Sequence, residues 1–369
     1  MLDPSLVSLT YLDEGAANIV YRISASPSAS PTRSSHHESY SRTTPPPSEI
    51  DTPPIRPSSS NPFPGQLLRL RKDNATAAVL DSHHHFNNRI APLLPTANLI
   101  QQTLVRASSH LIQKCNAGLR SMEKRGARSP QRAGVYLAEG EAFAVLVTDM
   151  SSSNSSSDRD APVEAETESL SVEFKPKWLA QSPNAPSNGT SRRCRTCALR
   201  ALRESRGPMP GDEKLLSSSS GFCPLKLMEQ DRGIVREVGN RIVELNRIRK
   251  EDRGWMEETL FAWLYGNALL ARLRTLQVVM DPEGVLMGNL ESPDFLTAMT
   301  MRDCTLFLRI PRDGGPIEAR LGDLDLKAAS PKKADYWRRV ERQLIDDGWY
   351  TAIGRGAAVE SEERCQLSQ

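Results

Sequence analysis

The chain has 369 residues, enough for two domains or for one large domain with two lobes. Its formal net charge is only +2, which excludes a protein that binds nucleic acid through overall positive charge. No run of the sequence approaches roughly 18 consecutive apolar residues, so no membrane-spanning helix is expected. The first residues lack the pattern of a secretory signal, and six cysteines in so long a chain indicate reduced thiols. We therefore expect a protein of the nucleus, the cytoplasm or both.

The first part of the chain is predicted to be rich in strands. A β-branched stretch at 18–23 follows a turn of small residues, and a strand-like pattern resumes at Leu67. The segment 24–64 between them is rich in Ser and Pro, and we interpret it as a disordered insertion that enlarges a hairpin loop. Further along, helical spacing of apolar residues predicts a helix at 97–124. Strands are then expected at 135–150 and 170–178.

The second part is predicted to be rich in helices. Amphipathic spacing predicts helices at 233–250 and 256–279, and a closing helix is expected at 336–347. Two short strands are predicted at 305–310 and 317–321. This order favours an α+β, two-lobed, kinase-like fold with a smaller β-rich N-terminal lobe and a larger helix-rich C-terminal lobe. We expect the lobes at 1–150, ending at a hinge, and at 151–353, with a frayed tail at 354–369.

Two short motifs in the first half of the chain carry candidate chemistry. The turn from Glu14 to Val20 has small side chains that let backbone N–H groups approach phosphate oxygens, although such a turn can be merely tight. In a strand, Lys175 and Lys177 would share one face with Glu173. Two adjacent ammonium groups repel each other, so they suggest a bound anion, the alternative being a solvated edge strand marked by a proline.

Two aspartates flank the predicted pair of short strands. Asp303 precedes the first strand, and Asp323 follows the second. Phosphoryl transfer needs one carboxylate near the attacking hydroxyl and another that holds Mg²⁺ on the phosphates. Aspartate is also common in turns, so this spacing alone leaves both interpretations open. Every histidine lies at or before His110, which makes Asp303 the better candidate for a general base.

These motifs together resemble the ordered signature of the inositol-pentakisphosphate 2-kinases, and the fungal members most closely. The E-x-K-P-K element is the hallmark of that family. The matching segments are Glu14 to Val20, Glu173-x-Lys175-Pro176-Lys177, Cys194-Arg195-x-Cys197, Cys223-Pro224-Leu225, Arg302-Asp303-Cys304 and Asp323-Leu324-Asp325-Leu326-Lys327. The resemblance implies an ATP- and Mg²⁺-dependent kinase that phosphorylates the 2-hydroxyl of inositol 1,3,4,5,6-pentakisphosphate to give inositol hexakisphosphate (phytate).

The resemblance also implies roles for individual residues. Asp303 would accept the proton of the 2-hydroxyl, Lys175 would contact the transferred phosphate, and Asp323 would coordinate Mg²⁺. The nucleotide set would be Gly15, Ala16, Ala17, Asn18, Val20, Arg69, the hinge Thr148-Asp149-Met150, and Glu173. The substrate set would be Arg128, Lys177, Arg203, Asn267, Lys327, Lys333 and Tyr336, with Lys332 as an alternative to Lys333. Arg203 stands where relatives carry lysine, and it keeps the positive charge.

Other classes of protein are weaker interpretations of the same sequence. A zinc module at Cys194 and Cys197 would have only Cys223 as a third ligand and no nearby histidine, whereas structural zinc takes four. A non-catalytic inositide or nucleic-acid binder could use the arginines from Arg192 to Arg206, but aromatic residues for base stacking are missing among them. A protein kinase would show the Gly-x-Gly-x-x-Gly and Asp-Phe-Gly motifs, which are absent from the sequence. A monomer is the default expectation.

Overall fold

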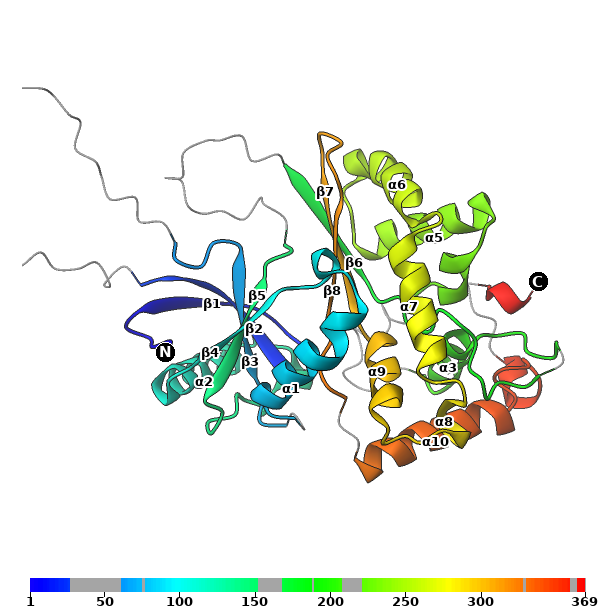
Figure 1. The fold of residues 1–369 in the computed structure, drawn as a ribbon, viewed down its shortest axis with the longest axis horizontal. Coiled ribbons are helices and arrows are strands. Elements are labelled where there is room, and N and C mark those ends of the chain that lie inside the picture. The colour runs from blue at the N-terminus through cyan, green and yellow to red at the C-terminus, as the bar shows by residue number, and fades with distance from the viewer. Residues whose placement is uncertain are drawn as a thin grey trace, which may run out of the picture.

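The structure is a computed structural model, and it describes residues 1–26, 61–74, 77–151, 168–187, 189–207, 221–327, 330–358 and 364–368. Mixed α and β elements make up these residues, in an arrangement consistent with a kinase-like fold (Figure 1). Most of the predicted insertion at 24–64 lies outside the described residues. Within the described ranges, no helix is both long enough and apolar enough to cross a membrane.

The N-terminal part is built on a five-stranded sheet with the order β1-β2-β3-β5-β4. Its strands are β1 (Val7–Glu14), β2 (Asn18–Ala25), β3 (Gln66–Arg71), β4 (Gln102–Arg106) and β5 (Phe143–Thr148). In β2, alternate side chains are buried, which is the period-2 pattern of a strand with one face on a core. Helix α2 (Ser109–Lys124) buries Leu111, Ile112 and Leu119 in the same core.

The predicted hairpin is confirmed by the pairing of β2 with β3. The strands are antiparallel, and Val20 lies opposite Arg69. The predicted boundary was wrong at its first residues, because Ser24 and Ala25 still belong to β2 and pair with β1. At the other end, residues 61–64 are described as well.

The C-terminal part combines a three-stranded sheet with most of the helices. The sheet has the order β6-β7-β8, from strands β6 (Ser169–Phe174), β7 (Thr305–Pro311) and β8 (Glu318–Gly322). The helices are α3 (Arg195–Ser205), α5 (Arg232–Leu245), α6 (Lys250–Leu264), α7 (Ala268–Val279), α8 (Gly284–Met287), α9 (Pro293–Met301) and α10 (Pro331–Asp346). Figure 1 shows the sheet between the N-terminal strands and these helices. The apolar core between the three-stranded sheet and these helices is distinct from the core of the five-stranded sheet.

Shorter helical elements lie between the strands and helices and in the tail. Helix α1 (Val79–His85) runs into a π-helical turn, Phe86–Ile90, and 3₁₀ turns span Ala91–Leu93, Thr96–Asn98, Pro130–Arg132, Pro224–Met228, Gly354–Ala358 and Gln366–Ser368. Leu99 forms a parallel bridge with Leu321 of β8, so main-chain pairing links the segment before β4 to the second sheet.

Two helix predictions need correction. The helix expected at 97–124 is β4 followed by α2, because residues 102–106 pair with β5 and Ser108 caps the helix by accepting a hydrogen bond from the Leu111 N–H. The helix expected at 256–279 is two helices, α6 and α7. Gly266 has φ +65°, a conformation that stops a helix, and Asn267 then caps α7.

The C-terminal tail was predicted to be frayed, and this was wrong for the part that the structure describes. Residues Gly354–Ala358 form a 3₁₀ turn, and Cys365 is only 4% exposed. Cys365 packs against Cys194, Cys197 and Cys223, far away in the sequence. Arg193 also donates to the Gly356 oxygen at 2.9 Å, so the tail contacts the body of the protein at two places.

Candidate active site

The topology of the second sheet brings the motif residues to one edge. Phe174 at the end of β6 pairs with Leu306 at the start of β7. Thr305 on β7 pairs in turn with Gly322 at the end of β8. The chain segments beyond these positions carry Lys175 and Lys177, Asp303, and Asp323 to Lys327. Antiparallel order alone therefore places three distant motifs side by side.

Three lysines surround two aspartates at this edge. Lys175 Nζ lies 3.0 Å from Asp323 Oδ2 and donates to the main-chain oxygen of Asp303, also at 3.0 Å. The two carboxylate oxygens of Asp303 are each contacted by a lysine: Lys177 Nζ lies 3.0 Å from Oδ1, and Lys327 Nζ lies 2.7 Å from Oδ2. The predicted catalytic, metal-binding and inositide-binding residues thus form one cluster.

Lys175 and Lys177 lie close together for a different reason from the one that the sequence predicted. Strand β6 ends at Phe174, so alternation along a strand does not place Lys175 and Lys177 together. Instead, the chain turns through Pro176, and Lys177 adopts the left-handed conformation with φ +55°. A left-handed lysine is uncommon, and such backbone strain is found mostly at functional sites.

The cluster changes the acidity of its members. Burial alone would raise the pKa of Asp303, but the ammonium groups of Lys327 and Lys177 outweigh it and hold that pKa below its ordinary value. For Lys177, burial dominates and lowers the pKa, although Asp303 opposes the shift. Asp303 is therefore a carboxylate at neutral pH, in contact with cations that an incoming polyanion would attract.

Asp323 has the features of a ligand for a hard cation. It follows β8 with φ +55°, accepts a hydrogen bond from the Thr305 hydroxyl, and is 54% exposed. Burial acts to raise its pKa, but Lys175 reverses the shift and lowers it. A carboxylate that is ionised, partly bonded and open to solvent fits Mg²⁺, which takes one or two protein carboxylates and completes its shell with water and phosphate oxygens.

A large basic pocket opens beside the cluster. It has a volume of about 1070 Å³. The predicted residues that line it are Glu173, Lys175, Lys177, Arg203, Asp303, Lys327, Lys333 and Tyr336. Lys333 of α10 faces this pocket, so the sequence alternative at Lys332 is not needed to supply a cation there. Its pKa is lowered by burial and by Lys327.

Further pocket cations were not among the predicted site residues. Arg247 follows α5 with φ +54° and lines the pocket, as do Arg200 and Arg206 of the segment around α3. Arg247 lies in no motif, so its charge was the only sequence signal. Arg200 and Arg206 lie in the arginine run that we had considered as a nucleic-acid surface.

The arginine run does not form one basic surface. Arg195 and Arg200 are 6% and 9% exposed, and Arg200 donates to the main-chain oxygen of Phe222. The backbone N–H groups of Arg192 and Arg193 both bond to the Tyr350 oxygen. Arg195 and Arg200 are thus buried and Arg203 and Arg206 line the pocket, whereas Arg192 is exposed, so the run does not present the single basic face that the nucleic-acid alternative requires.

Two predicted substrate residues are not brought to this pocket. Arg128 has a fully buried side chain, and its Nε lies 2.8 Å from Glu14 Oε1. Glu123 provides a second carboxylate for the same guanidinium. Asn267 uses its side-chain oxygen to cap α7, bonding to the N–H groups of Leu269 and Leu270. Both residues have structural tasks in this conformation.

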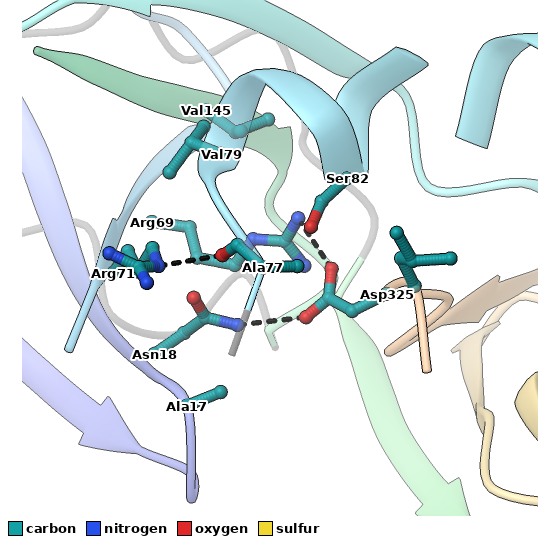
Figure 2. A pocket seen from close by; sticks show the side chains of 10 residues that line it. Ala17, Asn18, Arg69, Arg71, Ala77, Val79, Ser82, Val145 and Asp325 are labelled. Carbon is teal, nitrogen blue, oxygen red and sulfur yellow. Dashed lines mark hydrogen bonds and ion pairs between the residues drawn. The ribbon is translucent and has the colours of Figure 1, made fainter. Parts of the chain in front are cut away.

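A second, much smaller cavity lies where the two sheets meet, and Figure 2 shows its lining. It has a volume of about 60 Å³. Asp325 spans it: its Oδ2 accepts a hydrogen bond from Asn18 at 2.8 Å, and its Oδ1 lies 3.0 Å from Arg69 Nη2 (Figure 2). Asn18, Arg69 and Ala17 were predicted to contact the nucleotide, whereas the partner role of Asp325 was missed.

The other predicted nucleotide residues do not line this cavity, and Glu173 lines the large pocket instead. Gly15 and Ala16 form the turn between β1 and β2, and Val20 lies on β2. The Gly15 oxygen accepts a hydrogen bond from Lys72 Nζ at 2.8 Å, which fixes the turn. Thr148, Asp149 and Met150 follow at the end of β5, where the Asp149 N–H donates to the Gly65 oxygen.

Four cysteines form a separate candidate metal site, of which the sequence indicated only three members. The sulfur atoms of Cys194, Cys197, Cys223 and Cys365 all lie within 4.8 Å of one another and all four residues are buried. Two of the separations are 3.8 Å (Cys194–Cys223) and 3.7 Å (Cys223–Cys365). Zinc with four thiolates at about 2.3 Å in a tetrahedron requires sulfurs about 3.8 Å apart, so the geometry fits.

The fold and the lysine–aspartate cluster define an α+β protein of kinase type. Comparison with known families is consistent with this class: the sequence profile described as inositol-pentakisphosphate 2-kinase matches residues 11–343. The chain belongs to the inositol-pentakisphosphate 2-kinase family.

One curated relative carries the name of the same family. The chain is 36% identical over 192 residues to a protein named inositol-pentakisphosphate 2-kinase from Yarrowia lipolytica. The aligned region covers 51% of this chain and 56% of the relative, so the chain matches about half the length of that protein.

Proposed function

We propose that the protein is an ATP-dependent kinase that phosphorylates the 2-hydroxyl of inositol 1,3,4,5,6-pentakisphosphate to give inositol hexakisphosphate. The observation that carries this proposal is the Lys175–Lys177–Lys327 cluster on Asp303 and Asp323, whose three lysines also line the basic pocket. A substrate with five phosphates needs many cations, and the pocket supplies them from several elements. The name of the fungal relative supports the same reaction.

Asp303 is proposed as the group that accepts the proton of the attacking hydroxyl. In the described conformation, Lys177 and Lys327 neutralise its two oxygens. Phosphates of the substrate would compete for these two ammonium groups and thereby free the carboxylate. A strong base is not required, because phosphoryl transfer depends mainly on positioning and on charge stabilisation.

Lys175 and Asp323 are proposed to act on the phosphoryl group. Lys175 Nζ lies between the two aspartates, where it can neutralise charge on the transferred phosphate. Asp323 is proposed to hold Mg²⁺, which would neutralise charge on the phosphates of ATP. On the nucleotide side, Asn18, Arg69 and the turn at Gly15 to Ala17 would contact phosphates, with Val20 behind them. The hinge Thr148-Asp149-Met150 would meet adenine, and Glu173 would border the nucleotide.

The inositide site is proposed to lie in the large pocket. Its phosphates would be bound by Lys177, Arg203, Arg247, Lys327, Lys333 and Tyr336. Arg128 and Asn267 stay predictions, since Arg128 would first have to leave Glu14 and Asn267 is committed to a helix cap. The division into an N-terminal lobe at 1–150, a C-terminal lobe at 151–353 and a tail at 354–369 belongs to the same proposal, as do a monomeric state and a location in nucleus or cytoplasm.

Phosphoryl transfer from ATP and Mg²⁺ to inositol 1,3,4,5,6-pentakisphosphate tests the proposal directly. Wild type is expected to form inositol hexakisphosphate, whereas Asp303→Ala and Lys175→Ala should lose at least about 10²-fold in kcat while staying folded. Arg241→Ala, on an exposed pair with Glu244, serves as the control and should keep its activity. A folded wild type that forms no product would contradict the proposal.

We also propose that the four cysteines hold a structural zinc ion. Their positions correct the sequence argument against zinc, because Cys365 from the tail supplies the fourth ligand that the local spacing lacked. All four positions are filled by protein, which is the pattern of a structural site and leaves no open position for catalysis. The ion would join the start of α3, the segment at Cys223 and the tail.

A further inference from the structure

A buried amide connects the two segments that carry the proposed catalytic groups. Gln277 lies near the end of α7 and is 1% exposed. Its Nε2 donates to the Lys177 oxygen at 2.8 Å and to the Met301 oxygen at 3.2 Å. Its Oε1 accepts from the Leu179 N–H at 2.9 Å. One side chain thus holds the main chain on both sides of the cluster.

We propose that Gln277 is a positioning residue that sets the distance between Lys177 and Asp303. This inference rests on the proposed kinase activity. Fixing the Lys177 carbonyl maintains the left-handed backbone at that residue, which in turn aims its side chain at Asp303. Fixing the Met301 carbonyl holds the end of α9, two residues before Asp303. The ammonium and the carboxylate consequently meet at 3.0 Å.

Neighbouring contacts reinforce the same connection from the other side. Arg302 donates to the main-chain oxygen of Gln277 at 3.1 Å and to Asp281 at 2.5 Å, both near the end of α7. The guanidinium of Arg302 also lies 3.6 Å from the ring centre of Trp178. Since Arg302 precedes Asp303 and Trp178 follows Lys177, each catalytic segment is bound both to α7 and to the other segment.

The chemistry of the amide is specific to this task. Glutamine presents two donors and one acceptor in one plane, and all three are used here. An ionised glutamate would keep the acceptor and lose both donors, so two carbonyl oxygens would face a carboxylate. Methionine has a similar shape and would remove all three hydrogen bonds without adding a charge.

The chain contains a matched control for these substitutions. Asn116 of α2 is also 1% exposed, and its amide likewise bridges main chain, donating to the Leu137 oxygen at 3.1 Å and accepting from the Leu137 N–H at 2.9 Å. It lies in the core of the other sheet and contacts no proposed catalytic residue. Asn116→Leu therefore removes buried amide bonds with a comparable cost in thermal stability.

The experiment compares wild type, Gln277→Met, Gln277→Glu and Asn116→Leu below their melting temperatures. We expect both Gln277 variants to lose about 10- to 100-fold in kcat, because small misplacements of catalytic groups are costly, with KM for ATP within about twofold of wild type. Asn116→Leu should lose thermal stability and keep kcat. Wild-type kcat in Gln277→Met, or an equal loss in Asn116→Leu, would overturn the inference.

Hydrogen exchange separates this inference from the proposed activity. In Gln277→Met, the segments around 175–179 and 301–304 should exchange faster together, whereas Asn116→Leu should leave both at the wild-type rate. Unchanged exchange in both segments would contradict the positioning role even if kcat fell. If wild type transferred no phosphate, the proposed function would fail, and the exchange result would still decide whether Gln277 connects the two segments.

Discussion

Asp325 shows how a single carboxylate can occupy groups that are proposed for another ligand. It lies two residues after Asp323, yet it contacts the first sheet and not the lysine cluster. Its partners, Arg69 and Asn18, are the groups proposed for the phosphates of ATP. The side chains of Arg69 and Asp325 are 14% and 29% exposed, so the pair is only partly screened by solvent. A bound triphosphate would have to displace this carboxylate or share its partners.

Asp325→Asn is therefore expected to tighten nucleotide binding. The substitution removes a negative charge beside the phosphates and a competitor for Arg69, and we expect Kd for ATP to fall by about three- to tenfold. Calorimetric titration of ATP with and without Mg²⁺ measures the effect. Asp294→Asn is the control, because its 2.6 Å pair with Arg89 is exposed and lies away from the cavity. Weaker binding that appears only with Mg²⁺ would instead make Asp325 a metal ligand.

At the scale of elements, the sequence predicted several strands, but it missed β4 and made the strand expected at 135–150 too long, since β5 spans only Phe143–Thr148. The strand β2 was visible because a pattern with period 2 and β-branched residues coincide there, and β7 and β8 were found for similar reasons. The expected helix at 97–124 failed because Leu104 and Val105 fit either spacing, and only pairing with β5 decides between them. The cap residues Ser108 and Asn267 mark the true starts of α2 and α7, and the prediction did not use them.

In the predicted site, residues that lie in short motifs were found, whereas residues that act on distant partners were not. Lys175 and Lys177 lie in one short motif, and Asp303 and Asp323 lie beside predicted strands, so their meeting at one sheet edge could be anticipated. Gln277, Asp325 and Cys365 were missed. Each of these acts on partners far away in the sequence, such as the Lys177 carbonyl 100 residues from Gln277, and no local pattern reports such a contact.

The tail should depend on the proposed zinc site. Removing Cys365 leaves three thiolates, so Cys365→Ser is expected to lose zinc and to lower the melting temperature by several degrees. Metal analysis of the purified protein and thermal unfolding with and without a chelator measure both effects. The chelator should destabilise wild type and have little further effect on the variant.

Cys115→Ser provides the control for this measurement. Cys115 is buried in α2, away from the four cysteines, and its substitution should leave the zinc content unchanged. Wild type purified without metal, and insensitive to the chelator, would show that the four thiols pack without an ion.

Over the whole molecule, the near-neutral net charge conceals strong local separation of charge. The large pocket gathers cations, whereas the N-terminal core contains a buried ionic network in which Glu14 binds both Lys72 and Arg128. Glu14 and Lys72 are 3% and 1% exposed, so neither charge is solvated by water. The network lies directly behind the turn that is proposed to contact ATP, because Lys72 also holds the Gly15 oxygen.

This network makes stability depend on pH in the acidic range. Burial would raise the pKa of Glu14, but Arg128 and Lys72 overcome it and lower the pKa from 4.5 to about 2. A carboxylate with a lowered folded-state pKa stabilises the protein above pH 4.5, and this contribution is lost as the pH falls from 4.5 towards 2.

Urea unfolding of wild type across this range should show a falling free energy of unfolding. In Glu14→Gln, which cannot titrate, the slope should be shallower and the stability at neutral pH lower by about 3 kcal/mol, since Lys72 loses its carboxylate partner and Arg128 keeps only Glu123. Glu244→Gln, on an exposed pair with Arg241, should keep the wild-type slope. A wild-type slope in Glu14→Gln would place the origin of acid sensitivity elsewhere, with Asp303 and Asp323 as the next carboxylates to test, because their pKa values are also lowered.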